Sequence, residues 1–247
     1  MSHIHIPDGI LPVWLWLLGY AAVFLLFIIF KITADKDKIS KKLALAGTFS
    51  ALMILSMSFL IIPPMYHLNL VALTGIVIGP YLSLVSIFIV NLLLALAGHG
   101  GITIVGLNTL VLFLQAVIAF YGFRFLSRLF KNVFISVFLA AFIALIVSTC
   151  ANAAIVYIGT QNMGYITHVH HHHGFFTHDD EHGEEHEHGI QEEHEHSEKP
   201  ENFDMRKFLA FLLTFGSVGL ITESLLTGFI VSYINRVKPE VLNYENN

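Results

Sequence analysis

The sequence predicts an all-α membrane protein, a polytopic bundle of about seven transmembrane helices. Hydrophobic residues make up 55% of the 247 residues and charged residues only 13%, a composition that leaves little soluble mass. The apolar residues gather in long segments, and we expect each to be helical because lipid offers no water to an open backbone. These segments run roughly over 10–32, 43–62, 69–97, 102–123, 132–158 and 207–235.

The first apolar segment is expected to stay in the protein as a helix. No positive charge precedes it, and the run from Ile10 to Ile32 is long enough to span, since about 20 residues cross the hydrocarbon. Both properties argue against a cleavable signal peptide.

The segment 69–97 contains Gly79-Pro80 near its middle, where a helix would break. A single crossing would leave 8 basic residues on the cytoplasmic side and 5 outside, whereas two short crossings would give 10 and 3. The excess of bases in cytoplasmic loops favours two crossings and seven spans. We therefore expect a protein of the cell membrane with its N-terminus outside and its C-terminus in the cytoplasm. With either number of crossings, His67 lies on the same side of the membrane as the N-terminus.

One region is strongly polar. Between Gly159 and Asp204 lie 12 of the 18 acidic residues and 11 of the 15 histidines, with Lys199 the single base. This predicts three parts: 1–158 as the first part of a transmembrane metal-capture domain, 159–204 as an extracellular low-complexity loop, and 205–247 as the last helix and cytoplasmic C-terminus. The loop either concentrates divalent metal at many weak sites or acts as an acidic spacer.

Charge and cysteine content exclude other classes. Outside the polar loop the chain carries 12 bases against 6 acids, which is typical of cytoplasmic loops rather than of nucleic-acid binding. The single cysteine, Cys150, allows neither a disulfide framework nor a cysteine-based zinc site.

The N-terminus itself is a candidate chelator. If Met1 is removed, the Ser2 amine, the His3 amide nitrogen and the His3 imidazole form three coplanar donors. If Met1 is retained, Met1-Ser2-His3 offers four nitrogens. Such planar nitrogen surroundings suit Ni²⁺ or Cu²⁺ better than Ca²⁺, Mg²⁺ or tetrahedral Zn²⁺.

Further histidines could complete the planar set of nitrogen donors. A fourth donor could come from His67 or from His5, and the turn at Pro7-Asp8-Gly9 would fold the terminus inward. His99 lies between glycines that permit close backbone approach, so it is either a weaker ligand candidate or part of a tight turn.

Polar residues inside the apolar segments are few. An ionisable group there is a functional hypothesis by default, and for Glu223 we favour support of a neighbouring group or helix packing over direct metal ligation. The amides are interpreted as contacts between helices; they are Asn91, Asn108, Gln115 and Asn152. The second segment has small residues at spacings that let another helix approach, either of this chain or of another subunit: Ala44, Ala46, Gly47, Thr48, Ser50 and Ala51.

These residues together resemble a known family. The stretch His5-Ile6-Pro7-Asp8-Gly9-Ile10-Leu11-Pro12 is similar to the N-terminal signature of the CbiM/NikM family, the substrate-specific components of energy-coupling-factor transporters for cobalt and nickel. The resemblance covers the chain except the 159–204 loop. It continues through His67, Gly98-His99-Gly100-Gly101-Ile102-Thr103, Gly106-Leu107-Asn108 and Glu223-Ser224-Leu225-Leu226-Thr227-Gly228.

The resemblance implies seven helices and an N-terminus tucked into the membrane core. It implies a square-planar site made by the terminal amine, the amide and imidazole of the second residue, and His67. This chain has extra residues before its Ile-Pro-Asp-Gly turn, so either His3 or His5 could take the second-position role. Asp8, Asn108 and Glu223 are expected to support the site or the packing around it.

The function implied is a non-enzymatic substrate-capture subunit of an ATP-driven importer, supplying cobalt for cobalamin biosynthesis or supplying nickel. Co²⁺ or Ni²⁺ is then the transported substrate, and no cofactor is expected. The expected partners are the lipid bilayer, a transmembrane coupling subunit, ABC-type ATPase subunits and a small accessory membrane subunit, with no nucleic acid. The sequence contains no Gly-x-x-x-x-Gly-Lys-Ser/Thr loop of its own. The alternative is a secondary divalent-metal transporter of the zinc type, regulated by its His-rich loop.

Overall fold

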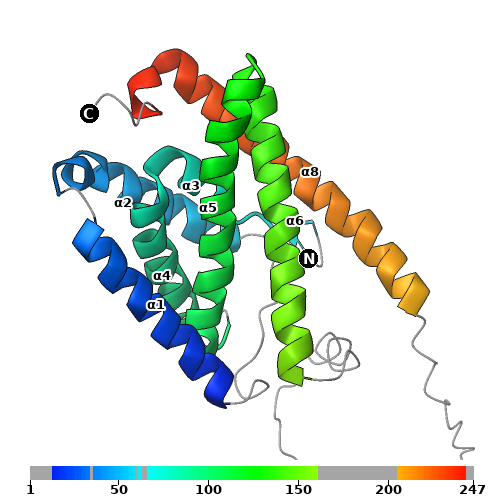
Figure 1. Cartoon of the computed structure of the whole chain (residues 1–247). Coiled ribbons are helices and arrows are strands. Elements are labelled where there is room, and N and C mark those ends of the chain that lie inside the picture. Colours follow the sequence, from blue (N-terminus) through cyan, green and yellow to red (C-terminus); the bar gives the residue numbers. More distant parts are fainter. Residues whose placement is uncertain are drawn as a thin grey trace, which may run out of the picture.

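The computed structural model describes residues 13–33, 36–58, 60–62, 66–98, 100–160 and 205–242. These ranges hold seven α-helices, two short strands and two 3₁₀ turns (Figure 1). The helices are α1 (Val13–Thr33), α2 (Lys36–Ser58), α3 (Val71–Ile78), α4 (Pro80–Leu96), α5 (Val105–Leu129), α6 (Val133–Thr160) and α8 (Met205–Val237). The strands are β1 (Leu60–Ile62) and β2 (Tyr66–His67), and the turns are η1 (Ile102–Ile104) and η2 (Pro239–Val241).

Four of the described helices have the length and composition of membrane spans. Four stretches of the described chain are long and apolar enough to cross a bilayer, namely Val13–Ile32, Ile102–Leu129, Val133–Ile155 and Gly216–Val237. Lys42–Ser58 and Pro80–Leu96 are shorter apolar helices. Large apolar side chains point outward, among them Phe24 at 62% exposed and Phe125 at 68%, as lipid rather than water would favour. The predicted all-α polytopic membrane bundle is confirmed.

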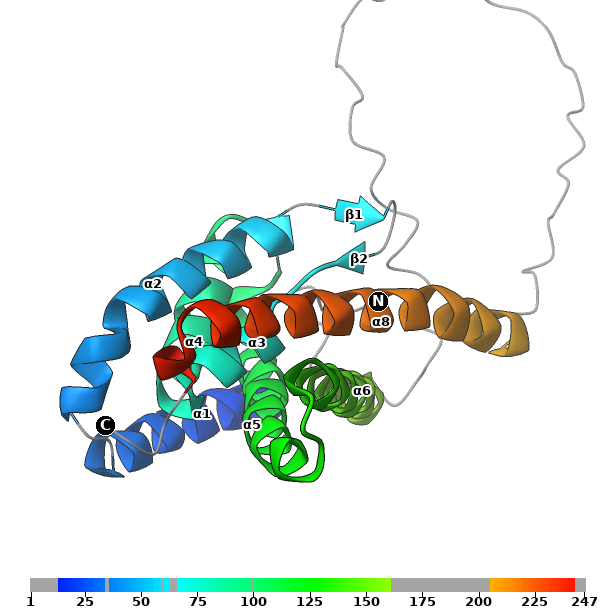
Figure 2. The ribbon, with the colours of Figure 1, turned by 90° about the horizontal axis from the view of Figure 1, so that it is seen from above.

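Helix α5 is the centre of the bundle. It packs against α1, α3, α4 and α6, while α8 packs mainly against α6 and also contacts α3. In Figure 2, α1 and α4 lie on one side of α5 and α6 lies on the other. The residues that meet at these contacts are small: a Cβ added to Gly106 of α5 would lie 2.7 Å from the backbone nitrogen of Tyr20 in α1. Close approach through small residues is the usual way that helices associate in membranes.

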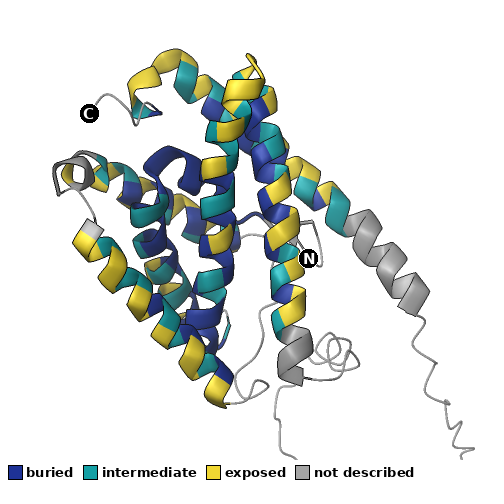
Figure 3. Cartoon of the chain, in the orientation of Figure 1, coloured by how far each residue is buried: buried dark blue, intermediate teal, exposed yellow. Residues whose placement is uncertain are grey.

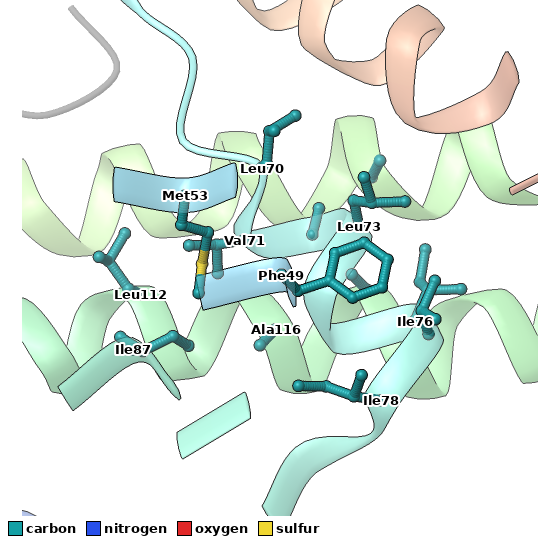
Figure 4. Close-up of a cluster of buried hydrophobic side chains, with 14 of the residues drawn as sticks. Phe49, Met53, Leu70, Val71, Leu73, Ile76, Ile78, Ile87, Leu112 and Ala116 are labelled. Carbon is teal, nitrogen blue, oxygen red and sulfur yellow. The ribbon is translucent and has the colours of Figure 1, made fainter. Parts of the chain in front are cut away.

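The buried core surrounds α3. All eight of its residues are buried, and α3 is the dark blue helix at the middle of Figure 3. Figure 4 shows the packing: Phe49 and Met53 of α2 lie over α3, with Ile87 of α4 and Ala116 of α5 beneath. Because α3 has eight residues, its rise is about 12 Å, well short of the roughly 30 Å of hydrocarbon. It is therefore a short helix enclosed by protein rather than by lipid.

The predicted break at Gly79-Pro80 is confirmed. Gly79 has φ 86° and ψ 168°, a conformation that glycine adopts without a Cβ clash. The Gly79 nitrogen makes the last helical bond of α3, to the Gly75 oxygen, and Pro80 has no N–H to make another. Pro80 instead occupies the first turn of α4, where its missing N–H is tolerated. The segment 69–97 therefore holds two helices that meet at this hinge.

The second apolar segment differs from its prediction as one helix over 43–62. Helix α2 ends at Ser58, and Leu60–Ile62 form strand β1, which pairs antiparallel with β2. The cause is Pro63-Pro64, because a residue before proline is pushed from helical toward extended backbone. Pairing with β2 supplies the hydrogen bonds that the helix no longer provides.

The helix ends place the basic residues together. The end of α1, the start of α2, the α5–α6 turn and the end of α8 share one end of the bundle (Figure 1). Lys42 of α2 joins them: its Nζ donates to the Val241 oxygen at 3.2 Å and lies 3.4 Å from the Val77 oxygen. A single crossing by 69–97 would have put Lys42 and Val241 at opposite ends. This arrangement gathers the ten bases of the two-crossing prediction at one end of the bundle.

Candidate metal site

Most of the predicted ligands lie outside the described residues. These are Met1, Ser2, His3, His5 and His99; Asp8, which is expected to support the site, lies outside the described residues as well. Of the predicted ligand set, the structure describes the backbone of His67, the last residue of β2. Asn108 and Glu223, expected to support the site or the packing, are described in full. The described part of the chain contains no group of three or more His, Cys, Asp or Glu able to hold a metal ion.

The backbone of His67 belongs to an antiparallel pair of strands. His67 lies opposite Leu60 and Tyr66 lies opposite Ile62, with an irregularity between Leu60 and Ile62. Strand β2 also contacts α2. Position 67 is therefore held by strand pairing as well as by the chain that follows it.

The chain leaves β2 through Asn69 and Leu70. The Asn69 Oδ1 accepts from the Val71 nitrogen at 2.9 Å, so the side chain satisfies one of the free amides at the start of α3. Leu70 has φ 52° and ψ 16°. This left-handed conformation costs a residue with a Cβ about 1–2 kcal/mol and persists only where the surroundings impose it.

A polar network in the protein interior lies beside this residue. Asn69 and Gln115 exchange two hydrogen bonds, from Asn69 Nδ2 to Gln115 Oε1 at 3.3 Å and from Gln115 Nε2 to Asn69 Oδ1 at 3.1 Å. The Ser148 hydroxyl of α6 lies 3.1 Å from the same Gln115 Oε1. Asn69 and Gln115 have no exposed surface and Ser148 has 3%.

This network lies deep in the bundle. Gln115 is the eleventh residue of the 25-residue α5, and Ser148 is near the middle of α6. The chain two residues beyond His67 is therefore at the depth of the middle of these helices. Sequence reasoning did not include Asn69; the available signal was an asparagine just before an apolar helix, a position where such residues cap helices.

The predicted contacts of amides between helices are confirmed for two of them. Gln115 of α5 accepts from the Ser148 hydroxyl of α6, and Asn91 of α4 donates to the Thr109 hydroxyl of α5 at 3.1 Å. Asn108, next to Thr109, is half-buried on the first turn of α5. Asn152 is buried in α6 at 9% exposed.

Glu223 is fully buried in α8. It lies one turn before Thr227, which is also fully buried, on a helix that contacts both α6 and α3. At the next turn, Gly228 is so close to α6 that an added Cβ would lie 3.0 Å from the Phe134 ring. Glu223 therefore belongs to the tightly packed interior and does not face lipid.

The small residues of α2 form a surface that the described helices leave open. Ala44, Gly47, Thr48 and Ala51 are exposed on one side of the helix, and a Cβ added to Gly47 would meet no atom within 4 Å. Ala46, on the opposite side, is 6% exposed and part of the core. The sequence left open whether these small residues meet a helix of this chain or of another subunit. No described helix of this chain packs on the exposed side.

Solved structures share this fold. The chain resembles a crystal structure of a transition metal transporter with a TM-score of 0.66 and 18% identity, covering 95% of this chain and 93% of the other. A second crystal structure, of a truncated transition metal transporter, aligns with a TM-score of 0.62 and 19% identity over 94% of this chain and 99% of the other. No curated protein sequence is significantly similar to the chain.

A family model settles the relationship. Residues 5–241 match the model of the cobalt uptake substrate-specific transmembrane region, CbiM. The match covers nearly the whole chain and includes both the expected N-terminal signature and the polar network. It identifies a transporter component and not an enzyme. The chain therefore belongs to the CbiM family, the substrate-specific transmembrane components of cobalt uptake.

Proposed function

We propose that the chain captures Co²⁺ or Ni²⁺ for an ATP-driven energy-coupling-factor importer, holding the ion between its own N-terminus and His67. The donors would be the terminal amine, a backbone amide, the imidazole of His3 or His5, and the imidazole of His67. The observation that carries this proposal is the depth of the chain after His67. Two residues beyond it, Asn69 is fully buried and bound to the middle of α5, so a ligand at position 67 is anchored to the bundle interior.

The donor chemistry supports the choice of metal. An amine, a deprotonated amide and imidazoles form a planar nitrogen set that suits late transition metals. Co²⁺ is the ion in the family's description, whereas the flat geometry also fits Ni²⁺. A competition titration of the purified chain with both ions would rank them. His99 is the weaker ligand candidate, and Glu223 and Asn108 would support the packing around the site, with Asp8 in the turn that directs the terminus inward.

Histidine substitutions test this proposal. In the purified full chain, His67→Ala and the double variant His3→Ala/His5→Ala should each lose tight Co²⁺ and Ni²⁺ binding. The matched control is His194→Ala/His196→Ala, which removes two histidines from the polar loop and should retain tight binding. Tight binding by the His3/His5 double variant would contradict the proposed chelate. Extra residues placed before Met1 should also weaken binding, because they displace the amine.

The exposed side of α2 is the proposed contact with the transmembrane coupling subunit. Its small residues allow the backbone of another helix to come close, and the described helices leave it uncovered. Gly47→Leu should reduce uptake in cells that carry the coupling and ATPase subunits, while metal binding by the isolated chain stays unchanged. Ala21→Leu, also on an exposed helix surface, is the control that should not reduce uptake. Equal uptake by both variants would place the coupling subunit elsewhere.

The distribution of basic residues gives the orientation of the chain in the proposed assembly. We place the basic end of the bundle in the cytoplasm by the positive-inside rule, next to ATPase subunits that supply the energy, with a small accessory membrane subunit as a further partner. The loop 159–204 would then lie outside and concentrate divalent metal.

The zinc-type secondary transporter has less support. Such a protein needs acidic and histidine ligands at mid-membrane, and Glu223 is the one acidic residue in the apolar spans that the structure describes. Measuring uptake with and without ATP and the partner subunits separates the two mechanisms. Uptake by this chain alone, driven by an ion gradient, would favour the secondary transporter.

A further inference from the structure

Gln115 connects three segments at the point where the chain leaves β2. Its amide binds Asn69 through both of its polar atoms, and its Oε1 also lies within hydrogen-bond distance of Ser148. Asn69 in turn accepts from the first amide of α3. One side chain of α5 thereby joins α6, the start of α3 and the chain that follows His67.

The network does more than pack helices. Amide groups in an apolar interior are costly unless their hydrogen bonds are made, and apolar residues of similar volume would pack α5 against α3 without that constraint. What apolar residues could not do is fix the path of residues 68–70. That path includes the left-handed Leu70, a conformation that needs surrounding structure to hold it.

We propose that Gln115 is a positioning residue for metal capture, acting through Asn69 on the strand that carries His67. This inference rests on the proposed function, in which His67 supplies a ligand. A binding site needs its ligands within about 0.5 Å of their productive positions. Release of Asn69 would let Leu70 relax, and residue 67, three positions earlier in the chain, would move with it.

The expected effect is a loss of affinity with the ligands themselves intact. Residues that orient metal ligands typically contribute about 10–100-fold to metal affinity. Gln115 acts one step further away, through the backbone, so the lower end of that range is expected. Gln115→Met keeps the length of the side chain and removes both hydrogen bonds to Asn69. We expect about tenfold weaker Ni²⁺ binding, with a change in the visible absorption that reports the planar coordination of Ni²⁺.

A matched control is available in the same helix bundle. Asn91→Leu removes another amide contact between helices, the bond from α4 to Thr109 of α5, but touches no residue between β2 and α3. The full chain, purified in detergent, would be titrated with Ni²⁺ alone. Asn91→Leu should bind with the affinity and spectrum of the unaltered protein. Loss of affinity in both variants would mean that general packing, and not positioning, is responsible, and would overturn the inference.

Two further measurements complete the test. If His67→Ala loses Ni²⁺ binding while Gln115→Met retains full affinity and an unchanged spectrum, the positioning role is wrong and the proposed function stands. If His67→Ala binds normally, the proposed function itself fails.

Should Gln115→Met not fold, an exchange of the two amides decides the question. Asn69→Gln lengthens one side chain of the pair by a methylene group, and Gln115→Asn shortens the other. The double variant restores the summed length of the two side chains. Recovery of affinity in the double variant relative to both single variants supports the inference, because it shows coupling through the pair. A double variant no better than the weaker single variant overturns it.

Discussion

Gly75→Ala is expected to destabilise the protein, although Gly→Ala at an uncrowded helix position usually stabilises a helix. Gly75 lies where α3 crosses α5, and a Cβ there would be 2.5 Å from the Ala116 oxygen and 2.7 Å from the Ala116 Cα. Both atoms belong to the backbone, so a side-chain rotation cannot relieve the clash. To reach ordinary contact at 3.4 Å, the two helices must separate by about 0.9 Å, measured along that contact.

The separation of α3 from α5 determines how far the free energy of unfolding falls. The hydrogen bonds between Asn69 and Gln115, now 3.1 and 3.3 Å, would stretch beyond hydrogen-bond range. Overpacking of a core costs about 1–3 kcal/mol, and two lost hydrogen bonds add about 1 kcal/mol each. We expect the free energy of unfolding to fall by about 3–5 kcal/mol.

Unfolding in mixed micelles, followed by circular dichroism, would measure this change. Gly47→Ala is the control, because the same substitution in α2 meets no atom within 4 Å and should stabilise the helix by up to about 1 kcal/mol. If Gly75→Ala unfolds like the unaltered protein, α3 and α5 are not in the close contact described above, and the reasoning about the network fails with it.

Two other predictions concern the polar loop and the orientation of the chain in the membrane. Deleting residues 168–196 should remove weak Co²⁺ sites in a titration but keep the tight one, whereas loss of the tight site would place it in the loop. In a Cys150→Ser background, Glu240→Cys should react with an impermeant thiol reagent only after the membrane is opened, since that end is proposed to be cytoplasmic; labelling of intact cells would reverse the orientation.

Much of the fold follows from the sequence because lipid leaves few choices. A long apolar segment must become a helix when no water can satisfy its backbone, so most spans could be predicted from composition alone. The Gly79-Pro80 break could be predicted as well, since it depends on the local chemistry of two residues. The family resemblance followed from a short N-terminal signature, and the family match over residues 5–241 agrees with it.

The segment 59–70 could not be predicted in the same way. Its apolar residues fit a helix or a strand equally well, and the two prolines at 63 and 64 favour the strand only when β2 is there to pair with it. Asn69 appears in the sequence as one polar residue in an apolar run. Its role depends on Gln115, 46 positions away in the chain, and no local pattern connects the two.

The sequence by itself determined that this chain is a membrane bundle with basic residues at one end, because hydrophobicity and charge act on each segment separately. The tertiary structure decided which segments meet: that α3 is enclosed by its neighbours, that one side of α2 remains uncovered, and that the chain after His67 is bound to the centre of α5. These contacts join residues far apart in the sequence. They depend on shape and on hydrogen-bond geometry in three dimensions, which composition and periodicity do not carry.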